Sequence, residues 1–351
     1  MALETFHRRG FLAGALATCV PAATGAAAAT TPPPVARLIL DNDFSGDPDG
    51  LYQLAHHVLS PSVDIELVVG SHLPGFSRAS SVHTATDAAS SVRELLRVMK
   101  RDGAYRVMAG AESAIASRTD WRPSPATDAI VREALREDGR GPLVYAAGAG
   151  LTEVALAWLA EPRIGKRLKL VWIGGGEHPG LALPPPGPAE LEFNYTIDPI
   201  AARIVFNESD IEIWQVPRDA YRRMLVSMAE LRELAKLGPT AEYLYSRLEG
   251  IKAYLANAPA GVAALRAETY VLGDSPLVTL SALHTVFQPD PASSTYTLLP
   301  TPKIDESGRY RPDPQGRPMR VYSQIDTRLT FADLAAKLRS ADAPAGRRRR
   351  P

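Results

Sequence analysis

Four carboxylates lie within nine residues of the chain, at Asp41, Asp43, Asp47 and Asp49, in a stretch that reads DNDFSGDPDG over residues 41–50. Negative charges this close repel one another strongly unless the stretch is highly solvated. A hard divalent cation is the natural compensation, because Ca²⁺ binds six to eight oxygen atoms of carboxylates and carbonyls. The stretch therefore predicts a calcium site.

Two simpler explanations of this acidic stretch compete with a metal site. Asp47 followed by Pro48 is a common start of a helix, in which the carboxylate caps the first turn and no metal is needed. Capping would explain Asp47 but neither Asp41 nor Asp43. An EF-hand loop is excluded, because its twelfth position would be Tyr52 where a bidentate Glu is required, and a strand-like run precedes the loop.

A third interpretation treats Asp41 and Asp43 as the nucleophile and the acid of a phosphatase or phosphotransferase, placed directly after a strand. The chain has no clear companion motifs for that chemistry. We therefore rank this interpretation last, and an assay of nucleotide phosphatase activity would test it.

The elements that must position these residues follow from the apolar pattern. Short apolar runs of strand length lie at residues 35–40, 65–69, 105–108, 143–146, 168–173 and 211–216. Between most of them the apolar side chains recur three and four positions apart, as a helix packed on a sheet requires, at residues 51–59, 88–99, 129–135 and 152–159.

Strands that alternate with helices predict one α/β domain with an open, mostly parallel, Rossmann-like sheet flanked by helices. In such a sheet the carboxyl ends of the strands open toward the same rim, so ligands bind in the loops that leave those ends. Residues 219–256 and 275–286 read as mostly helical and are placed to cap that rim. We expect this domain to span residues 35–340.

The two ends of the chain read differently from the domain. Residues 1–29 combine Arg8 and Arg9 with a small-residue apolar run, as in a twin-arginine export signal, which predicts a periplasmic or secreted protein. A Pro-rich connector follows at residues 30–34, and residues 341–351 read as a disordered basic tail. Cys19 is the only cysteine and lies inside the expected signal, so the mature protein would hold no disulfide.

The overall composition narrows the class of partner. The 351 residues are 45% hydrophobic and 22% charged, with 39 basic and 39 acidic side chains. A balanced charge gives no net field that would attract nucleic acid or an acidic membrane, and beyond the signal no segment approaches the length of a membrane span. A small-molecule substrate is expected, and a homo-oligomer stays open.

Five blocks in the same order resemble the inosine-uridine-preferring nucleoside hydrolase superfamily. The acidic stretch is similar to its D-x-D-x-G-x-D-D loop, and residues 192–202 (EFNYTIDPIAA) are similar to its E-F-N-x-x-x-D-P-x-A-A segment. The other three blocks are residues 142–156 (PLVYAAGAGLTEVAL), 170–176 (LVWIGGG) and 273–277 (GDSPL). Their joint occurrence in one order is far more specific than any block alone.

The resemblance implies roles for individual residues. Asp43 and Asp274 would bind Ca²⁺ directly, together with a backbone carbonyl near Ala147 or Gly148, and Asp49 would be both a metal-site residue and the base on metal-bound water. Asp47 is a further candidate ligand. Asp41 would support the residues around the metal and substrate. Glu192 and Asn194 would form hydrogen bonds with the sugar hydroxyls.

Two departures from the family pattern bear on activity. Gly50 stands where the family has a second adjacent Asp that binds calcium, so that Asp47 is a possible substitute, and Gly273 stands where the family has a late His linked to the leaving group. His72 and His178 follow strand-like runs and are therefore candidate substrate contacts, although a lone loop histidine is more often structural.

The resulting hypothesis is a calcium-dependent hydrolase of N-glycosidic bonds in ribonucleosides or related ribosyl compounds. Cleavage builds positive charge on the sugar, so nearby carboxylates would stabilise the transition state while one Asp accepts the proton of the attacking water. The alternative, suggested by Gly50 and Gly273, is a catalytically impaired periplasmic protein that binds nucleosides or sugars in the presence of calcium.

Overall fold

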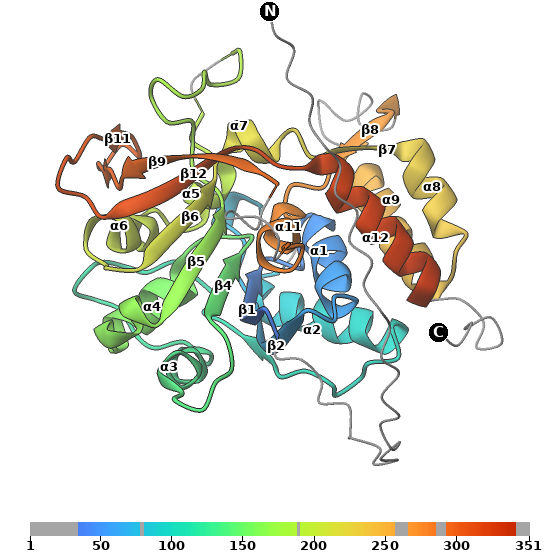
Figure 1. Cartoon of the computed structure of the whole chain (residues 1–351), viewed down its shortest axis with the longest axis horizontal. Coiled ribbons are helices and arrows are strands. Elements are labelled where there is room, and N and C mark those ends of the chain that lie inside the picture. Colours follow the sequence, from blue (N-terminus) through green and yellow to red (C-terminus); the bar gives the residue numbers. More distant parts are fainter. Residues whose placement is uncertain (1–33, 78–80, 188–189, 257–265, 286–292, 342–351) are drawn as a thin grey trace, which may run out of the picture. The chain divides into compact units, whose positions relative to one another are not determined.

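An open α/β sheet is the centre of the computed structural model, which describes residues 34–77, 81–187, 190–256, 266–285 and 293–341 (Figure 1). The expected export signal, most of the connector and nearly all of the basic tail lie outside these ranges. Within them, the eight-stranded sheet has the spatial order β3 (Val107–Ala109), β2 (Val63–Gly70), β1 (Ala36–Asn42), β4 (Leu143–Ala147), β5 (Leu168–Ile173), β6 (Glu212–Val216), β12 (Pro318–Gln324) and β9 (Thr295–Pro300).

The sheet is parallel from β3 through β12, and β9 pairs with β12 in the antiparallel direction at one edge. Strand β1 lies between β2 and β4, so the carboxyl end of β1 is flanked by a strand on each side. The predicted fold class, an open and mostly parallel sheet in one α/β domain, is confirmed.

Helices cover both faces of the sheet because side chains alternate along each strand. On β1, Leu38 and Leu40 pack into one buried cluster and Ile39 into the other. The cluster around Ile39 includes α3 (Thr127–Leu135), α4 (Thr152–Ala160) and α6 (Pro199–Asn207), and the cluster around Leu38 includes α1 (Asp49–Val58), α2 (Thr84–Val98), α8 (Met228–Ala235), α9 (Pro239–Ala256), α11 (Pro276–Ser281) and α12 (Thr327–Ala341).

The first part of the chain forms the expected elements within a few residues, whereas the last part contains more strand than the sequence analysis predicts. Residues 219–256 are interrupted by β7 (Leu225–Ser227), which pairs with β8 (Thr269–Val271). Strands β9 and β12 extend the main sheet, and a small ladder joins β10 (Lys303–Ile304) to β11 (Tyr310–Arg311). In the described part of the chain, no helix has the length and apolarity that a bilayer span requires.

Asp198 connects three elements beneath the rim of the sheet. Its carboxylate caps α6 by accepting the N–H of Ala201 at 2.9 Å, with Pro199 at the first helical position. It also accepts the N–H of Ile115 at 2.8 Å and the hydroxyl of Thr152 at 2.9 Å. One buried carboxylate therefore fastens α4, α6 and the loop after β3 to one another.

Replacement of this carboxylate is expected to destabilise the fold. Asp198→Ala removes a helix cap and leaves buried donors unpaired, and should lower the free energy of unfolding by about 2–4 kcal/mol. Chemical denaturation measures the change. Asp102→Ala, which removes an exposed carboxylate in the turn after α2, is the control, and an equal loss in both variants would contradict the assignment.

Candidate active site

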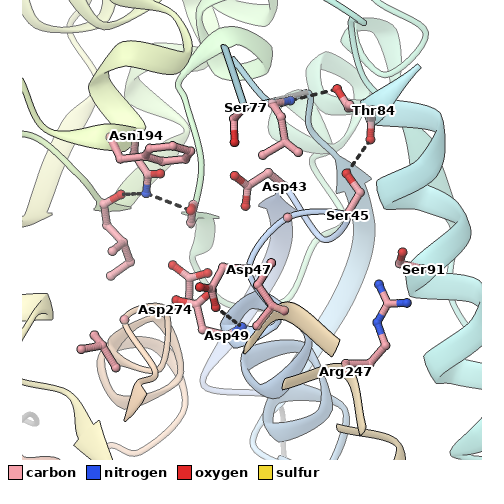
Figure 2. A pocket seen from close by; sticks show the side chains of 18 of the residues that line it. Asp43, Ser45, Asp47, Asp49, Ser77, Thr84, Ser91, Asn194, Arg247 and Asp274 are labelled. Atoms are coloured by element: carbon pink, nitrogen blue, oxygen red, sulfur yellow. Dashed lines mark hydrogen bonds between the residues drawn. The ribbon is translucent and has the colours of Figure 1, made fainter. Parts of the chain in front are cut away.

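A cavity of about 660 Å³ opens at the carboxyl ends of β1, β4 and β5, where the topology predicts a ligand site (Figure 2). Acidic side chains from distant parts of the chain line it. They include Asp43, Asp47 and Asp49 from the start of α1 and the loop before it, and Asp274 from the turn before α11; Asp87 of α2 and Glu192 line the cavity as well. The structure therefore brings together the four carboxylates that were predicted as metal ligands.

The loop after β1 sets the positions of its carboxylates. A tight turn, in which Gly46 donates its N–H to the carbonyl of Asp43 at 2.7 Å, reverses the chain directly after the strand. Asp47 then accepts the N–H of Asp49 at 3.1 Å at the start of α1, and it also accepts the hydroxyl of Tyr270 at 2.7 Å. The N-cap residue of α1 is Pro48 and not Asp47, so Asp47 only fixes the turn before the helix, and it lines the cavity as well.

Asp274 does not act as a helix cap. Its carboxylate turns away from α11 and accepts the Nδ2–H of Asn42 at 2.8 Å, across 232 positions of sequence. The Oδ1 atom of Asn42 in turn accepts the N–H of Asp43 at 2.9 Å. Asn42 thus links the strand end to the late acidic residue and holds Asp43 and Asp274 beside each other.

The buried carboxylates favour their protonated forms in the absence of compensating charge. Burial, followed by repulsion from Asp274, holds the pKa values of both Asp43 and Asp49 well above the usual range. Burial likewise raises the pKa of Asp274 to about 7, even though Asn42 donates to it. No cationic side chain forms an ion pair with these carboxylates in the described ranges.

This donor set fits a hard cation that is only partly enclosed. Several carboxylate oxygens face one cavity with their repulsion uncompensated, which is the condition that binding of Ca²⁺ relieves. Within the described residues, no group of three or more His, Cys, Asp or Glu side chains lies close enough together to hold a metal ion by itself. Backbone carbonyls and a ligand's hydroxyls would have to complete the coordination.

The two residues near the end of β4 for which a ligand carbonyl was expected, Ala147 and Gly148, differ in their access to the cavity. Ala147 is the last residue of β4 and is fully buried, whereas Gly148 lines the cavity. A Cβ atom at position 148 would lie 2.8 Å from Oδ1 of Asp274, so only glycine leaves room for the carboxylate. Gly148 therefore allows the close approach of strand end and ligand group.

Glu192 and Asn194 both line the cavity, but they have different roles in the fold. Glu192 caps α5 (Phe193–Ile197) and accepts N–H groups of Asn194 and Tyr195, the N–H of Gly175 at 2.6 Å and the hydroxyl of Tyr221 at 2.7 Å. These protein donors already occupy the carboxylate that the sequence assigns to the sugar. A structural role for Glu192 is therefore established by its contacts.

Asn194 has one polar atom left for a ligand. Its Nδ2 group donates to the carbonyls of Gly148 at 2.9 Å and Ile173 at 2.8 Å (Figure 2). These two bonds use both N–H donors and orient the amide, so Oδ1 is an acceptor at the cavity wall. Asn194 therefore suits a hydroxyl donor of the kind that a sugar provides.

Three other predicted site residues do not line the cavity. Asp41 is buried and accepts the hydroxyls of Ser71 and of Tyr145, the latter at 2.6 Å, so it supports the end of β1 from behind. His178 donates or accepts at Gln215 and stacks on Tyr310 with ring centroids 4.3 Å apart. His72 is also buried. The structure thus gives neither histidine a position for direct substrate contact.

The cavity extends toward residues that the sequence analysis does not identify. Ser45, Thr84 and Ser91 lie on the side of α2, and Arg247 reaches it from α9 (Figure 2). Arg247 is the one Lys, Arg or His side chain in the described lining. Its place within a helical, partly polar segment gives no distinctive motif, so only the packing of α9 beside α2 reveals it.

Comparison with known proteins agrees with this geometry. The family model described as inosine-uridine preferring nucleoside hydrolase matches residues 38–288. Segments of the chain are 42% identical over 90 residues to an inosine-uridine preferring nucleoside hydrolase of Leishmania major, and 52% identical over 68 residues to one of Crithidia fasciculata. These segments cover 25% and 19% of this chain, and 27% and 19% of the two relatives.

Solved structures extend the likeness to the whole fold. A purine-preferring ribonucleoside hydrolase from Gardnerella vaginalis superposes with a TM-score of 0.64, covering 87% of this chain and 99% of the other. The sequence identity over that superposition is 19%, so this likeness concerns the fold.

The raised pKa values predict how a cation should affect stability at different pH. The unfolded carboxyls ionise near 3.8, and the folded Asp274 near 7, so without metal the folded state loses stability as pH rises through this window. Ca²⁺ favours the ionised forms, and it should therefore raise the melting temperature more at about pH 8 than at about pH 5.

Thermal unfolding in chelator and in excess Ca²⁺ at both pH values measures this difference. The variant Asp274→Asn, which lacks one ionisable group, should show a smaller difference. Equal stabilisation by Ca²⁺ at both pH values in the unmodified chain would be inconsistent with metal binding by these carboxylates.

Proposed function

This chain belongs to the inosine-uridine preferring nucleoside hydrolase family, and from that premise we propose that it hydrolyses the N-glycosidic bond of ribonucleosides or related ribosyl compounds with Ca²⁺ as cofactor. The observation that carries the proposal is the convergence of Asp43, Asp49 and Asp274 on one cavity wall, opposite the oriented amide of Asn194. In open parallel α/β sheets, small-molecule ligands bind at the carboxyl ends of the strands, which is where this cavity lies.

The residues divide the work of binding and reaction between them. Asp43, Asp274 and the carbonyl of Gly148 would hold Ca²⁺, with Asp47 as a further ligand. When bound, the ion would orient the sugar hydroxyls and lower the pKa of a water molecule. Asn194 would accept a hydrogen bond from a sugar hydroxyl, which fixes the ring against the carboxylates.

Asp49 is the proposed general base. It lies at the first position of α1, beside Asp274, and it is less deeply buried than Asp43. In hydrolysis Asp49 would accept a proton from water while the water oxygen bonds to the anomeric carbon of the sugar. The bond from that carbon to the nucleobase nitrogen would break, and its electron pair would leave with the nucleobase. The remaining carboxylates would stabilise the positive charge that builds on the sugar.

A second candidate is a binding protein without turnover, for which Gly273 is the specific observation. A Cβ atom at this position would lie 3.3 Å from Oδ2 of Asp49, so the position faces the proposed base and brings no functional group to it. Stabilisation by nucleosides with no release of free base would favour this alternative. Export by the signal at residues 1–29 would place either protein in the periplasm or outside the cell.

Variants of the two central carboxylates test the proposed reaction. Free nucleobase should be released from inosine or uridine in the presence of Ca²⁺ and not after chelation. Asp49→Asn should lower kcat by at least about a hundredfold because the general base is removed. Asp274→Asn should weaken Ca²⁺ binding in calorimetry. Chromatography of the products measures turnover, and full activity in chelator would refute the cofactor assignment.

Arg247 is the proposed contact for the departing nucleobase, because it is cationic and reaches the cavity on the side of α2, away from Asn194 (Figure 2). Loss of a charged hydrogen bond that is worth about 1.5–3 kcal/mol should lower kcat/KM for inosine about 10- to 100-fold in Arg247→Ala. An activated 4-nitrophenyl riboside, which needs less help to leave, should be affected less.

Steady-state kinetics with both substrates separate a leaving-group role from a general defect. Lys236→Ala removes an exposed cation that pairs with Glu233 on α8 and is the matched control. Equal losses for inosine and the nitrophenyl substrate in Arg247→Ala would exclude a role in leaving-group stabilisation.

A further inference from the structure

A chain of buried polar side chains begins at Asp274 and runs away from the cavity into the core. It passes from Asn42 to Gln53 and His57 on α1 and ends at Ser281 on α11, and each of these four side chains is at most 1% exposed. None of the four lines the cavity. Burial of uncharged polar groups is costly unless they are all hydrogen bonded, so this arrangement needs an explanation.

The donors and acceptors of the chain have one consistent assignment. The hydroxyl of Ser281 donates to the carbonyl of Leu277 at 2.6 Å, so toward His57 it accepts, and the distance from Nε2 of His57 to Oγ of Ser281 is 2.9 Å. Nε2 of His57 therefore carries the proton. Nδ1 is then the acceptor for the side-chain amide N–H of Gln53.

The same logic continues to the carboxylate. Since Nε2 of Gln53 donates to His57, its Oε1 atom is the acceptor, and it receives one N–H of Asn42 over 3.5 Å, the longest link of the chain. The other N–H of Asn42 donates to Oδ2 of Asp274 at 2.8 Å. Every link thus selects the orientation of the next, and the last one selects the orientation of Asp274.

The hydrogen-bonded series from Asn42 to Ser281 contains no charged side chain. Burial lowers the pKa of His57 well below its usual value, with a smaller contribution from the neighbouring His56, so the imidazole is neutral. Lys337 lies on α12 and acts in the same direction. A neutral imidazole keeps Nδ1 as an acceptor, which the amide of Gln53 requires.

Two glycines make room for this arrangement. A Cβ atom at Gly50 would lie 2.8 Å from Nδ2 of Asn42, and one at Gly148 would lie 2.3 Å from it. Neither distance is compatible with a side chain at that position. The amide of Asn42 is therefore closely enclosed beside Asp274 and has little freedom to turn.

We propose that His57 is a positioning residue, which acts through Gln53 and Asn42 to hold the carboxylate of Asp274 in the orientation that receives the divalent cation. The inference rests on the proposed function in one respect only, namely that Asp274 is a ligand of the cation. It assigns no contact between His57 and the substrate. Its effect should therefore appear first in the affinity for Ca²⁺.

The adjacent histidine provides a matched control. His56 is on the same helix and equally buried, but its Nε2 atom bonds to Asp333 of α12 at 2.7 Å and has no link to Asp274. His56→Leu and His57→Leu remove the same ring from neighbouring positions. A purely structural role for His57 predicts similar effects of both variants on melting temperature and on metal affinity.

Calorimetric titration with Ca²⁺, with melting temperatures recorded in parallel, tests the proposal. His57→Leu should weaken Ca²⁺ binding about 10- to 100-fold, whereas His56→Leu should stay within about twofold of the unmodified chain. If His57→Leu does not fold, Gln53→Met interrupts the same series of hydrogen bonds with little change in side-chain volume. It should weaken Ca²⁺ binding to the same extent. Nucleoside hydrolysis lost at low Ca²⁺ should be largely recovered at saturating Ca²⁺.

The outcomes distinguish this inference from the proposed function. Unchanged Ca²⁺ affinity in both His57→Leu and Gln53→Met, with turnover intact in the unmodified chain, would overturn the positioning role and leave the proposed function standing. An unmodified chain that neither binds Ca²⁺ nor releases base would overturn both.

Discussion

Repulsion between carboxylates at the carboxyl end of β1 is the interaction on which the site depends. Asp43, Asp49 and Asp274 are held in one cavity by the backbone of β1, the start of α1 and the turn before α11. Burial raises the free energy of their ionised forms, as their raised pKa values indicate. The fold tolerates this unfavourable arrangement because packing on both faces of the sheet fixes the elements that bear the charges.

Gly50 illustrates how a departure from a family pattern is explained by a neighbouring residue. From the sequence, Gly50 reads as a lost carboxylate that weakens the case for a calcium site. In the structure, a side chain at this position would collide with the amide of Asn42, which contacts both Asp43 and Asp274. Gly50 therefore leaves the space in which the amide of Asn42 lies beside Asp274.

The sequence predicts what depends on local periodicity and on strand direction. The parallel strands β1 to β6 and the helices between them follow from apolar spacing and from the alternation of strands with helices. The convergence of Asp43 with Asp274 was expected only from the resemblance to the nucleoside hydrolase family, because Asp274 follows no strand of the main sheet. Strands β12 and β9 were missed, because β12 pairs with distant β6 and the edge strand β9 pairs with β12. His178 was misplaced, since only tertiary packing shows that its ring stacks on Tyr310 beneath the surface.

The same distinction applies to residues that resemble substrate contacts. Glu192 and Asn194 occupy one motif, yet the carboxylate of Glu192 is occupied by protein donors while Asn194 keeps a free acceptor. A motif therefore identifies a segment, and the hydrogen-bond inventory decides which of its atoms are available to a ligand. By this criterion Glu192 shapes the wall by capping α5 and anchoring the turn at Gly175, so that Asn194 can present its oxygen to a sugar.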